Sequence, residues 1–146
     1  MVMCMEKQGK KLLIMRAAPG SGKSTWIKNN VLTMGCEVSV CSADDFFILH
    51  GRGEYKFDPK LLFAAHNQCF RRARKAMERE VPVVVIDNTN IKKRDYVRYI
   101  ECAKENDYEV FQKVLDGNYG NVHGVPEDKV ESMRLAFEVD NTIDHW

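Results

Sequence analysis

The sequence AAPGSGKST, from Ala17 to Thr25, directly follows the apolar run LLIM at residues 12–15 and leads into a helical pattern. This order of strand, glycine-rich turn and helix is the context of a phosphate-binding loop. Small residues let the chain turn tightly, so that successive backbone N–H groups point inward and surround phosphate oxygens. The stretch therefore predicts a site for a phosphorylated ligand.

Two side chains of this stretch match the chemistry of such a site. Lys23 brings a positive charge to the β- and γ-phosphates of a ligand, and Ser24 offers a hydroxyl to a magnesium ion. The N-terminus of the helix that begins here adds its partial positive charge. Together these features predict an anion that is bound with a metal ion.

One position departs from the phosphate-loop pattern G-x-x-x-x-G-K-[ST], because Ala17 stands where the pattern has its first glycine. An alanine is tolerated there if its φ is negative, since the backbone conformations that favour glycine are expected at Gly20 and Gly22. The alternative is an ordinary Gly/Ser turn. The Gly-Lys-Ser order, the preceding strand and the following helix argue against that alternative.

The composition is that of one globular domain with a sizeable core: 146 residues, of which 45% are hydrophobic, so residues 1–146 are expected to form a single domain. The 22 basic and 21 acidic residues leave a net charge of +1, which does not favour a polyanion partner for the chain as a whole. Five cysteines without C-x-x-C spacing are typical of reduced thiols. No signal-peptide pattern and no membrane-spanning apolar run is present. We expect an intracellular protein of the cytoplasm, with the nucleus as the alternative, and no membrane partner.

Apolar runs and helical patterns alternate along the rest of the chain. Strands are predicted at residues 11–16, 37–42, 81–86 and 108–114, and helices begin near residues 24, 58, 91 and 126. The first helix is predicted to end at Gly35. This order favours an α/β fold of the P-loop NTPase type, with a parallel sheet of order 2-3-1-4 sandwiched by helices. Residues 50–57 and 115–124 are predicted to be loops, the second at the position of a lid, and residues 140–146 a tail.

Acidic residues follow two of the predicted strands, at the edge where open parallel sheets bind their ligands. Asp44 and Asp45 come after the second strand, and Asp87 follows the third. A carboxylate at the position of Asp87 can hold a magnesium ion or its waters. The alternative is that these residues cap the helices that follow, and at Asp87 both roles can hold.

The helix that begins near residue 58 carries the densest positive cluster of the chain, Arg71, Arg72, Arg74 and Lys75. The cluster could face a polyanion. A solvated helix face is the more frequent explanation for such a charge run.

Four motifs resemble those of the P-loop kinases of the polynucleotide-kinase-like family, which includes the kinase domain of phage polynucleotide kinase. They are PGSGKST after the first strand, SADDF after the second, VIDNTN after the third and NVHGVP before the last helix. The resemblance covers nearly the whole chain. It implies ATP and Mg²⁺ as cofactors and Asp44 as the general base that acts on the acceptor hydroxyl. Asp87 matches the family's Asp-Thr-Asn site, with the additional residue Asn88 before Thr89.

Two features differ from the family's pattern. Phe47 stands where the phage-type enzymes carry an arginine that grips a substrate phosphate. The stretch from Asp116 to Gly124 contains no Arg or Lys, whereas the family's lid carries arginines. A cation normally stabilises the transferred phosphoryl group, and its loss can lower the rate by roughly a thousandfold. Arg52, Lys113 and Arg134 are the candidates to replace the missing lid arginines, and the sequence alone places none of them at the site.

The first hypothesis is an ATP- and magnesium-dependent phosphotransferase that moves the γ-phosphate to a hydroxyl, such as the 5′-hydroxyl of a nucleic acid or a nucleotide. Its predicted catalytic residues are Asp44 and Lys23, and its metal ligands are Ser24 and Asp87. ATP would be bound by Pro19, Gly20, Ser21, Gly22, Lys23, Ser24 and Thr25, and the substrate by Asp45, Thr89 and Asn90. The alternatives are a nucleotide-binding regulatory module without turnover and a small-metabolite kinase that shares the site.

Overall fold

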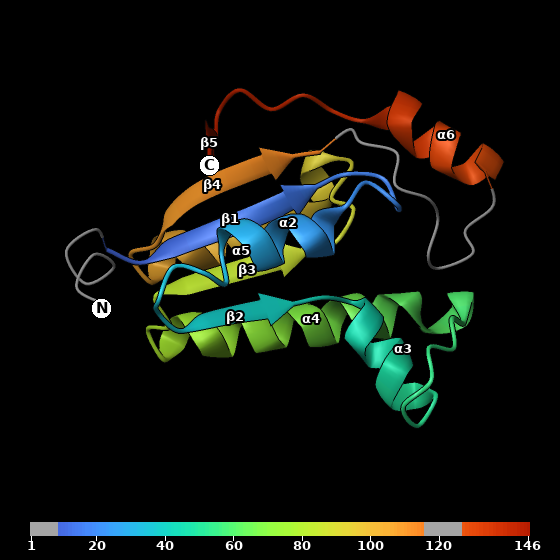
Figure 1. Cartoon of the computed structure of the whole chain (residues 1–146), viewed down its shortest axis with the longest axis horizontal. Helices are drawn as coiled ribbons and strands as arrows, with labels where there is room; N and C mark the ends of the chain where they lie inside the picture. The colour runs from blue at the N-terminus through green and yellow to red at the C-terminus, as the bar shows by residue number, and fades with distance from the viewer. Residues whose placement is uncertain (1–8, 116–126) are drawn as a thin grey trace.

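A parallel sheet of five strands, with the order β2-β3-β1-β4-β5, lies at the centre of the computed structural model (Figure 1). The structure describes residues 9–115 and 127–146, without the side chains of His50, Glu127, Val130 and Arg134. The strands are β1 (Lys11–Arg16), β2 (Val38–Cys41), β3 (Val83–Asp87), β4 (Glu109–Val114) and β5 (Asp144–His145). The helices are α2 (Lys23–Asn30), α3 (Asp44–His50), α4 (Leu62–Glu78), α5 (Lys93–Glu105) and α6 (Glu127–Ala136), with a 3₁₀ turn η1 (Pro59–Leu61) before α4.

The central strand is β1, which pairs in parallel with β3 on one side and with β4 on the other. β2 and β5 then extend the sheet at its two edges, also in parallel. The register places Met15 beside Asp87 and Arg16 beside Val114. The carboxyl ends of the strands therefore meet at one edge of the sheet, and the predicted phosphate loop follows β1 at that edge.

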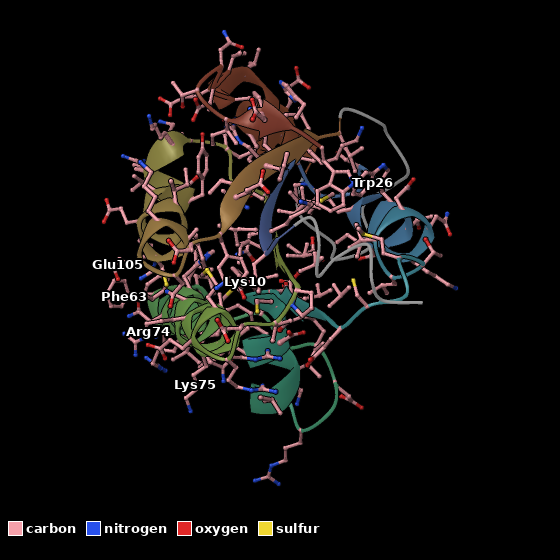
Figure 2. All side chains as sticks on the ribbon, turned by 90° about the vertical axis from the view of Figure 1, so that its left-hand side faces the viewer. Lys10, Trp26, Phe63, Arg74, Lys75 and Glu105 are labelled. Atoms are coloured by element: carbon pink, nitrogen blue, oxygen red, sulfur yellow. The ribbon has the colours of Figure 1, made fainter. Side chains whose placement is uncertain are left out.

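The side chains of β1 alternate between two apolar cores, one on each face of the sheet. Leu12 and Ile14 belong to the core shared with α4 and α5, whereas Leu13 and Met15 pack with α2. All four side chains are completely buried. Figure 2 shows the two outer layers, with Trp26 of α2 on one side and Lys75 of α4 on the other.

The predicted fold is confirmed, and the order 2-3-1-4 is the observed order of the first four strands. α2 is shorter than predicted, because the backbone N–H of Leu32 donates to the carbonyl of Ile27 at 3.0 Å and closes the helix near Asn30 instead of Gly35. Asp58 caps η1, since its Oδ1 accepts from the N–H of Lys60 at 3.0 Å. Within the residues that the structure describes, no helix has both the length and the apolar character of a membrane span.

The segment 140–146, predicted to be a tail, instead contains β5 and belongs to the sheet. The N–H of Trp146 donates to the carbonyl of Gln112 in β4 at 2.9 Å, and the Trp146 ring meets the ring of Phe111 edge to face at 5.8 Å. The Gln112 side chain is buried and donates to the carbonyls of Asp140 and Ile143. Residues 140–146 are therefore part of the folded unit.

A buried arginine connects this C-terminal segment to the end of β1. Arg16 has no exposed surface, and its guanidinium donates to three backbone carbonyls, those of Asn90 at 2.9 Å, Ile91 at 3.1 Å and Glu138 at 2.6 Å. A fourth bond, at 3.1 Å, reaches Oε1 of Gln112. Burial lowers the pKa of Arg16, because the charged form loses its hydration. Arg16 thus joins β1 to the segment that follows β3, to strand β4 and to the C-terminal segment.

We expect Arg16→Met to lower the free energy of unfolding by about 3 kcal/mol, because it leaves buried carbonyls without a donor. The substitution also removes the cation–π contacts of the guanidinium, whose Cζ lies 4.7 Å from the ring centroid of Tyr96 and 4.4 Å from that of Phe137. Urea denaturation measures the change. The control is Arg71→Met on the exposed side of α4, for which we expect a change within about 0.5 kcal/mol. Equal effects of the two substitutions would contradict the role of Arg16.

Candidate functional site

The loop between β1 and α2 has the backbone conformation that a phosphate-binding loop requires. Gly20 and Gly22 have φ values of 79° and 83°, in the left-handed region that favours glycine. Ala17 is not among the residues with positive φ, so alanine is accommodated there as predicted. Gly22 is the N-cap of α2, and no side chain of the described residues caps this helix. Its first N–H groups are therefore suited to a bound anion.

Lys23 lies at the centre of the charged groups of the site. Its Nζ donates to the carbonyl of Ala17 at 3.3 Å, which folds the side chain back over the loop. Burial lowers the pKa of Lys23, whereas the negative charges of Asp87 and Asp44 act in the opposite direction. Both carboxylates are thus within electrostatic range of the Lys23 ammonium group. The charges of Lys23, Asp44 and Asp87 therefore act on one another at this end of the sheet.

Asp87 ends β3 directly beside Met15 of β1, and the next residues hold the start of the phosphate loop. The carbonyl of Thr89 accepts from the N–H of Ala17 at 2.9 Å. No group of three or more His, Cys, Asp or Glu residues that could hold a metal occurs in the described ranges 9–115 and 127–146. Magnesium in phosphate-binding sites needs only one or two protein oxygens, because phosphates and waters supply the others. The exposed Ser24 hydroxyl and Asp87 fit a magnesium ion of that kind.

Two asparagines after β3 support the site through hydrogen bonds to the backbone. Asn88 Oδ1 accepts from the N–H of Ala43 at 2.9 Å and so fixes the start of α3 to the end of β3. Asn90 has a φ of 47° and is 2% exposed, and its Nδ2 donates to the carbonyl of Met15 at 2.7 Å. The side chain of Asn90, a predicted substrate residue, is thus occupied in supporting β1. In the sequence, Asn88 stands out only as an additional residue of the VIDNTN motif, so its support of α3 was not predicted.

Asp44 and Asp45 begin α3 but point to different neighbours. Asp44 Oδ1 accepts from the hydroxyl of Tyr55 at 3.3 Å, and its backbone N–H donates to Ser42 Oγ. Asp45 Oδ2 accepts from Nη1 of Arg72 in α4 at 2.9 Å, on the outside of the molecule. The N-cap of α3 is Ala43, without a capping side chain among the described residues, so neither aspartate is the cap. Asp44 is the member of the pair whose charge acts on Lys23.

Tyr55 is a residue of the site that the sequence did not single out. It belongs to the predicted loop 50–57, and its ring packs on the buried ring of Phe47 at 6.1 Å. Burial, together with the charge of Asp44, raises the pKa of Tyr55 to about 12, so its hydroxyl is protonated and donates. Phe47 also packs on Phe57 at 5.1 Å, so an aromatic cluster occupies the position next to Asp44.

The candidate cations from the sequence lie in different surroundings. Nζ of Lys113 lies 5.2 Å from the ring centroid of Trp26 in α2. Arg52 is exposed in the loop after α3, with a φ of 57°. The side chain of Arg134 and the predicted lid at 116–124 lie outside the described residues. Of the three candidates, Lys113 is the one that the structure ties to α2, the helix that begins at Lys23.

A cavity of about 270 Å³ adjoins the phosphate loop, bounded by Ala17, Ser21, Val114, Leu115 and Phe137. Its lining is mostly apolar. An apolar surface next to a phosphate-binding backbone suits a ligand that carries both phosphates and a flat ring, as nucleotides do.

A family model described as "AAA domain" matches residues 12–116, a range that includes the phosphate loop, Asp44 and Asp87. NEDD4-binding protein 2 of Homo sapiens is 30% identical to this chain over 134 residues. That match covers 86% of this chain and 7% of the human protein, so the chain spans a small part of its relative's length.

Solved structures share the fold at lower sequence identity. A chain of the Pnkp1/Rnl/Hen1 complex has a TM-score of 0.60 and 22% identity, and the match covers 94% of this chain and 43% of that chain. Kti12 of Chaetomium thermophilum, in complex with ADP-AlF3, has a TM-score of 0.60 and 12% identity, with 92% of this chain and 88% of that chain covered. The arrangement of β1, the loop and α2 thus belongs to a fold that recurs in other proteins.

Proposed function

The chain belongs to the AAA domain family, and from its P-loop kinase-like domain we propose that it is an ATP-dependent kinase acting on a hydroxyl acceptor. The observation that carries the proposal is the position of Lys23, which follows Gly20 and Gly22 of the loop and is within electrostatic range of Asp44 and Asp87. A cation, an anion-binding backbone and two carboxylates, one at the start of α3 and one at the end of β3, are groups that phosphoryl transfer uses.

In this proposal the loop holds the phosphates of ATP. The backbone N–H groups between Pro19 and Thr25 surround the phosphate oxygens, and Lys23 contacts the β- and γ-phosphates. Ser24 and Asp87 would hold a magnesium ion, which when bound neutralises charge on those phosphates. The mostly apolar cavity beside Ala17 suits the nucleoside part of the ligand.

Asp44 is the proposed general base. It takes the proton of the acceptor hydroxyl while the hydroxyl oxygen forms a bond to the γ-phosphorus and the bond from that phosphorus to the bridging oxygen breaks. ADP leaves with that oxygen. The hydrogen bond from the N–H of Ala43 to Asn88 fixes the start of α3, so Asp44 keeps its position relative to the phosphate loop.

We propose a nucleic-acid end with a free 5′-hydroxyl as the first acceptor to be tested. The SADDF and VIDNTN motifs support this acceptor. The similarity to a chain of the Pnkp1/Rnl/Hen1 assembly, which is described as an RNA repair complex, supports it as well. Arg71, Arg74 and Lys75 form an exposed basic face on α4 that suits a phosphate backbone. Thr89 and Asp45 are the remaining candidates for contact with the acceptor.

A nucleotide-binding module without turnover is the second candidate function. The absence of Arg and Lys from residues 116–124 favours it, because no lid cation is then available for the transition state. Kti12, whose structure holds ADP-AlF3, shows that the shared fold accommodates a nucleotide. A kinase for a small metabolite would share the site and differ in its acceptor.

The test is transfer of labelled γ-phosphate in the presence of Mg²⁺ to a panel of acceptors: RNA and DNA oligonucleotides with a 5′-hydroxyl, the same oligonucleotides with a 5′-phosphate, nucleosides and small alcohols. Transfer to the 5′-hydroxyl ends alone would support the nucleic-acid acceptor. ATP binding by calorimetry without transfer to any of them would favour the module without turnover.

A further inference from the structure

The loop after α3 folds back along the helix from which it comes. The carbonyl of Phe47 accepts from the N–H groups of Gly51 at 3.0 Å and Lys56 at 3.4 Å, so both ends of the loop are fixed to one residue of the helix. A third bond joins the N–H of Gly53 to the carbonyl of Ile48 at 2.9 Å. The path of residues 51–56 is therefore set by α3 itself.

This path brings Tyr55 next to the N-terminal turn of α3. The Tyr55 ring packs against Phe47, and its hydroxyl reaches Oδ1 of Asp44 at 3.3 Å. Asp44 and Phe47 are three residues apart, so they lie on the same side of the helix. The ring is thus held on one turn while its hydroxyl contacts the carboxylate of the previous turn.

We propose that Tyr55 is a positioning residue for Asp44, an inference that rests on the proposed function of Asp44 as general base. By donating to Oδ1, the Tyr55 hydroxyl holds the carboxylate in one orientation. A general base must lie within hydrogen-bond reach of the proton that it takes, and an error of about 1 Å can lower the rate by roughly a hundredfold. In this proposal Tyr55 acts through its hydrogen bond to Asp44.

Gly51 gives an independent way to move Tyr55. A Cβ atom at residue 51 would lie 1.9 Å from the carbonyl oxygen of Glu54, a distance that no real contact tolerates. Gly51→Ala therefore has to displace the backbone next to Tyr55. We expect this substitution, which leaves both Tyr55 and Asp44 in the sequence, to lower the rate as Tyr55→Phe does.

The experiment compares four proteins: wild type, Tyr55→Phe, Gly51→Ala and the control Tyr108→Phe. Tyr108 also donates its hydroxyl, to the carbonyl of Val81 at 2.6 Å, but at the other end of the sheet. We expect Tyr55→Phe and Gly51→Ala to lower kcat by roughly tenfold to a hundredfold, with KM for ATP unchanged. The control should keep its kcat. A kcat of wild-type size in Tyr55→Phe would overturn the inference.

A second measurement does not depend on activity. Thermal unfolding of Tyr55→Phe, Asp44→Ala and the double variant forms a double-mutant cycle. If the hydroxyl holds the carboxylate, the Tm shift of the double variant is smaller than the sum of the single shifts. Additive shifts would overturn the inference even if the wild type transfers no phosphate. A wild type without transfer to any acceptor would instead reject the proposed function.

Discussion

Lys23→Ala is expected to weaken the binding of ATP by about a hundredfold, since a partly buried ammonium that contacts phosphates contributes on the order of 2–3 kcal/mol. In the variant, the negative charge of Asp44 is no longer offset by the ammonium group of Lys23, so its repulsion of the phosphates adds to the loss. Isothermal titration calorimetry with Mg²⁺ and a non-hydrolysable ATP analogue measures the change.

The matched control is Lys28→Ala, which removes an exposed lysine of the same helix. Its affinity for the analogue should stay within about twofold, because exposed charges at a distance are screened by salt. The Tm of nucleotide-free Lys23→Ala should not fall, because burial already disfavours the charged ammonium in the folded protein. Unchanged affinity in Lys23→Ala would contradict the assignment of the loop as the ATP site.

Asp44→Asn is expected to lower kcat by roughly 10²- to 10⁴-fold, which is the usual contribution of a general base. Asparagine keeps the size of the side chain and can still accept from the Tyr55 hydroxyl, so the geometry of α3 is preserved. The affinity for ATP should not fall, because a negative charge near the phosphates has been removed. Single-turnover transfer to the best acceptor of the panel measures the rate of the chemical step.

Asp107→Asn serves as the control for Asp44→Asn. Asp107 is exposed in the turn between α5 and β4 with a φ of 61°, a conformation that asparagine also adopts readily. We expect its kcat to equal that of the wild type. If Asp44→Asn were as active as this control, Asp44 could not be the base, and the proton would have to leave by another route.

The fold was predictable because its core strands carry strong local signals. The runs that became β1 and β3 are continuously apolar, as strands buried on both faces are, and the glycine-rich loop fixes the fold around them. β5 was missed because its two residues, Asp144 and His145, are polar and exposed and show no alternation. Its pairing is fixed by long-range contacts, such as that of Trp146 with Gln112, and these leave no trace in the local sequence.

The sequence also predicted that Asp44 and Asp87 lie at the edge of the sheet that carries the phosphate loop, because the strand ends of a parallel sheet meet at one edge, and both carboxylates act electrostatically on Lys23. The supporting residues were not predictable in the same way. Arg16 ends a strand, where a charged residue is normally solvated, yet it is completely buried among backbone carbonyls. Tyr55 reaches Asp44 only because the loop returns along α3. Such contacts depend on backbone paths for which a single sequence has no periodic signal.

Because β1 is the central strand of the sheet, the order of translation determines when it can pair with its neighbours. β1 is made first, but both of its neighbours, β3 and β4, lie much later in the chain, and β2 cannot replace them because β3 separates the two strands. The backbone of residues 12–15 thus leaves the exit tunnel without a neighbouring strand and stays so until residues 83–87 have been translated. A nascent chain in that condition is a natural client of chaperones that shield extended apolar segments.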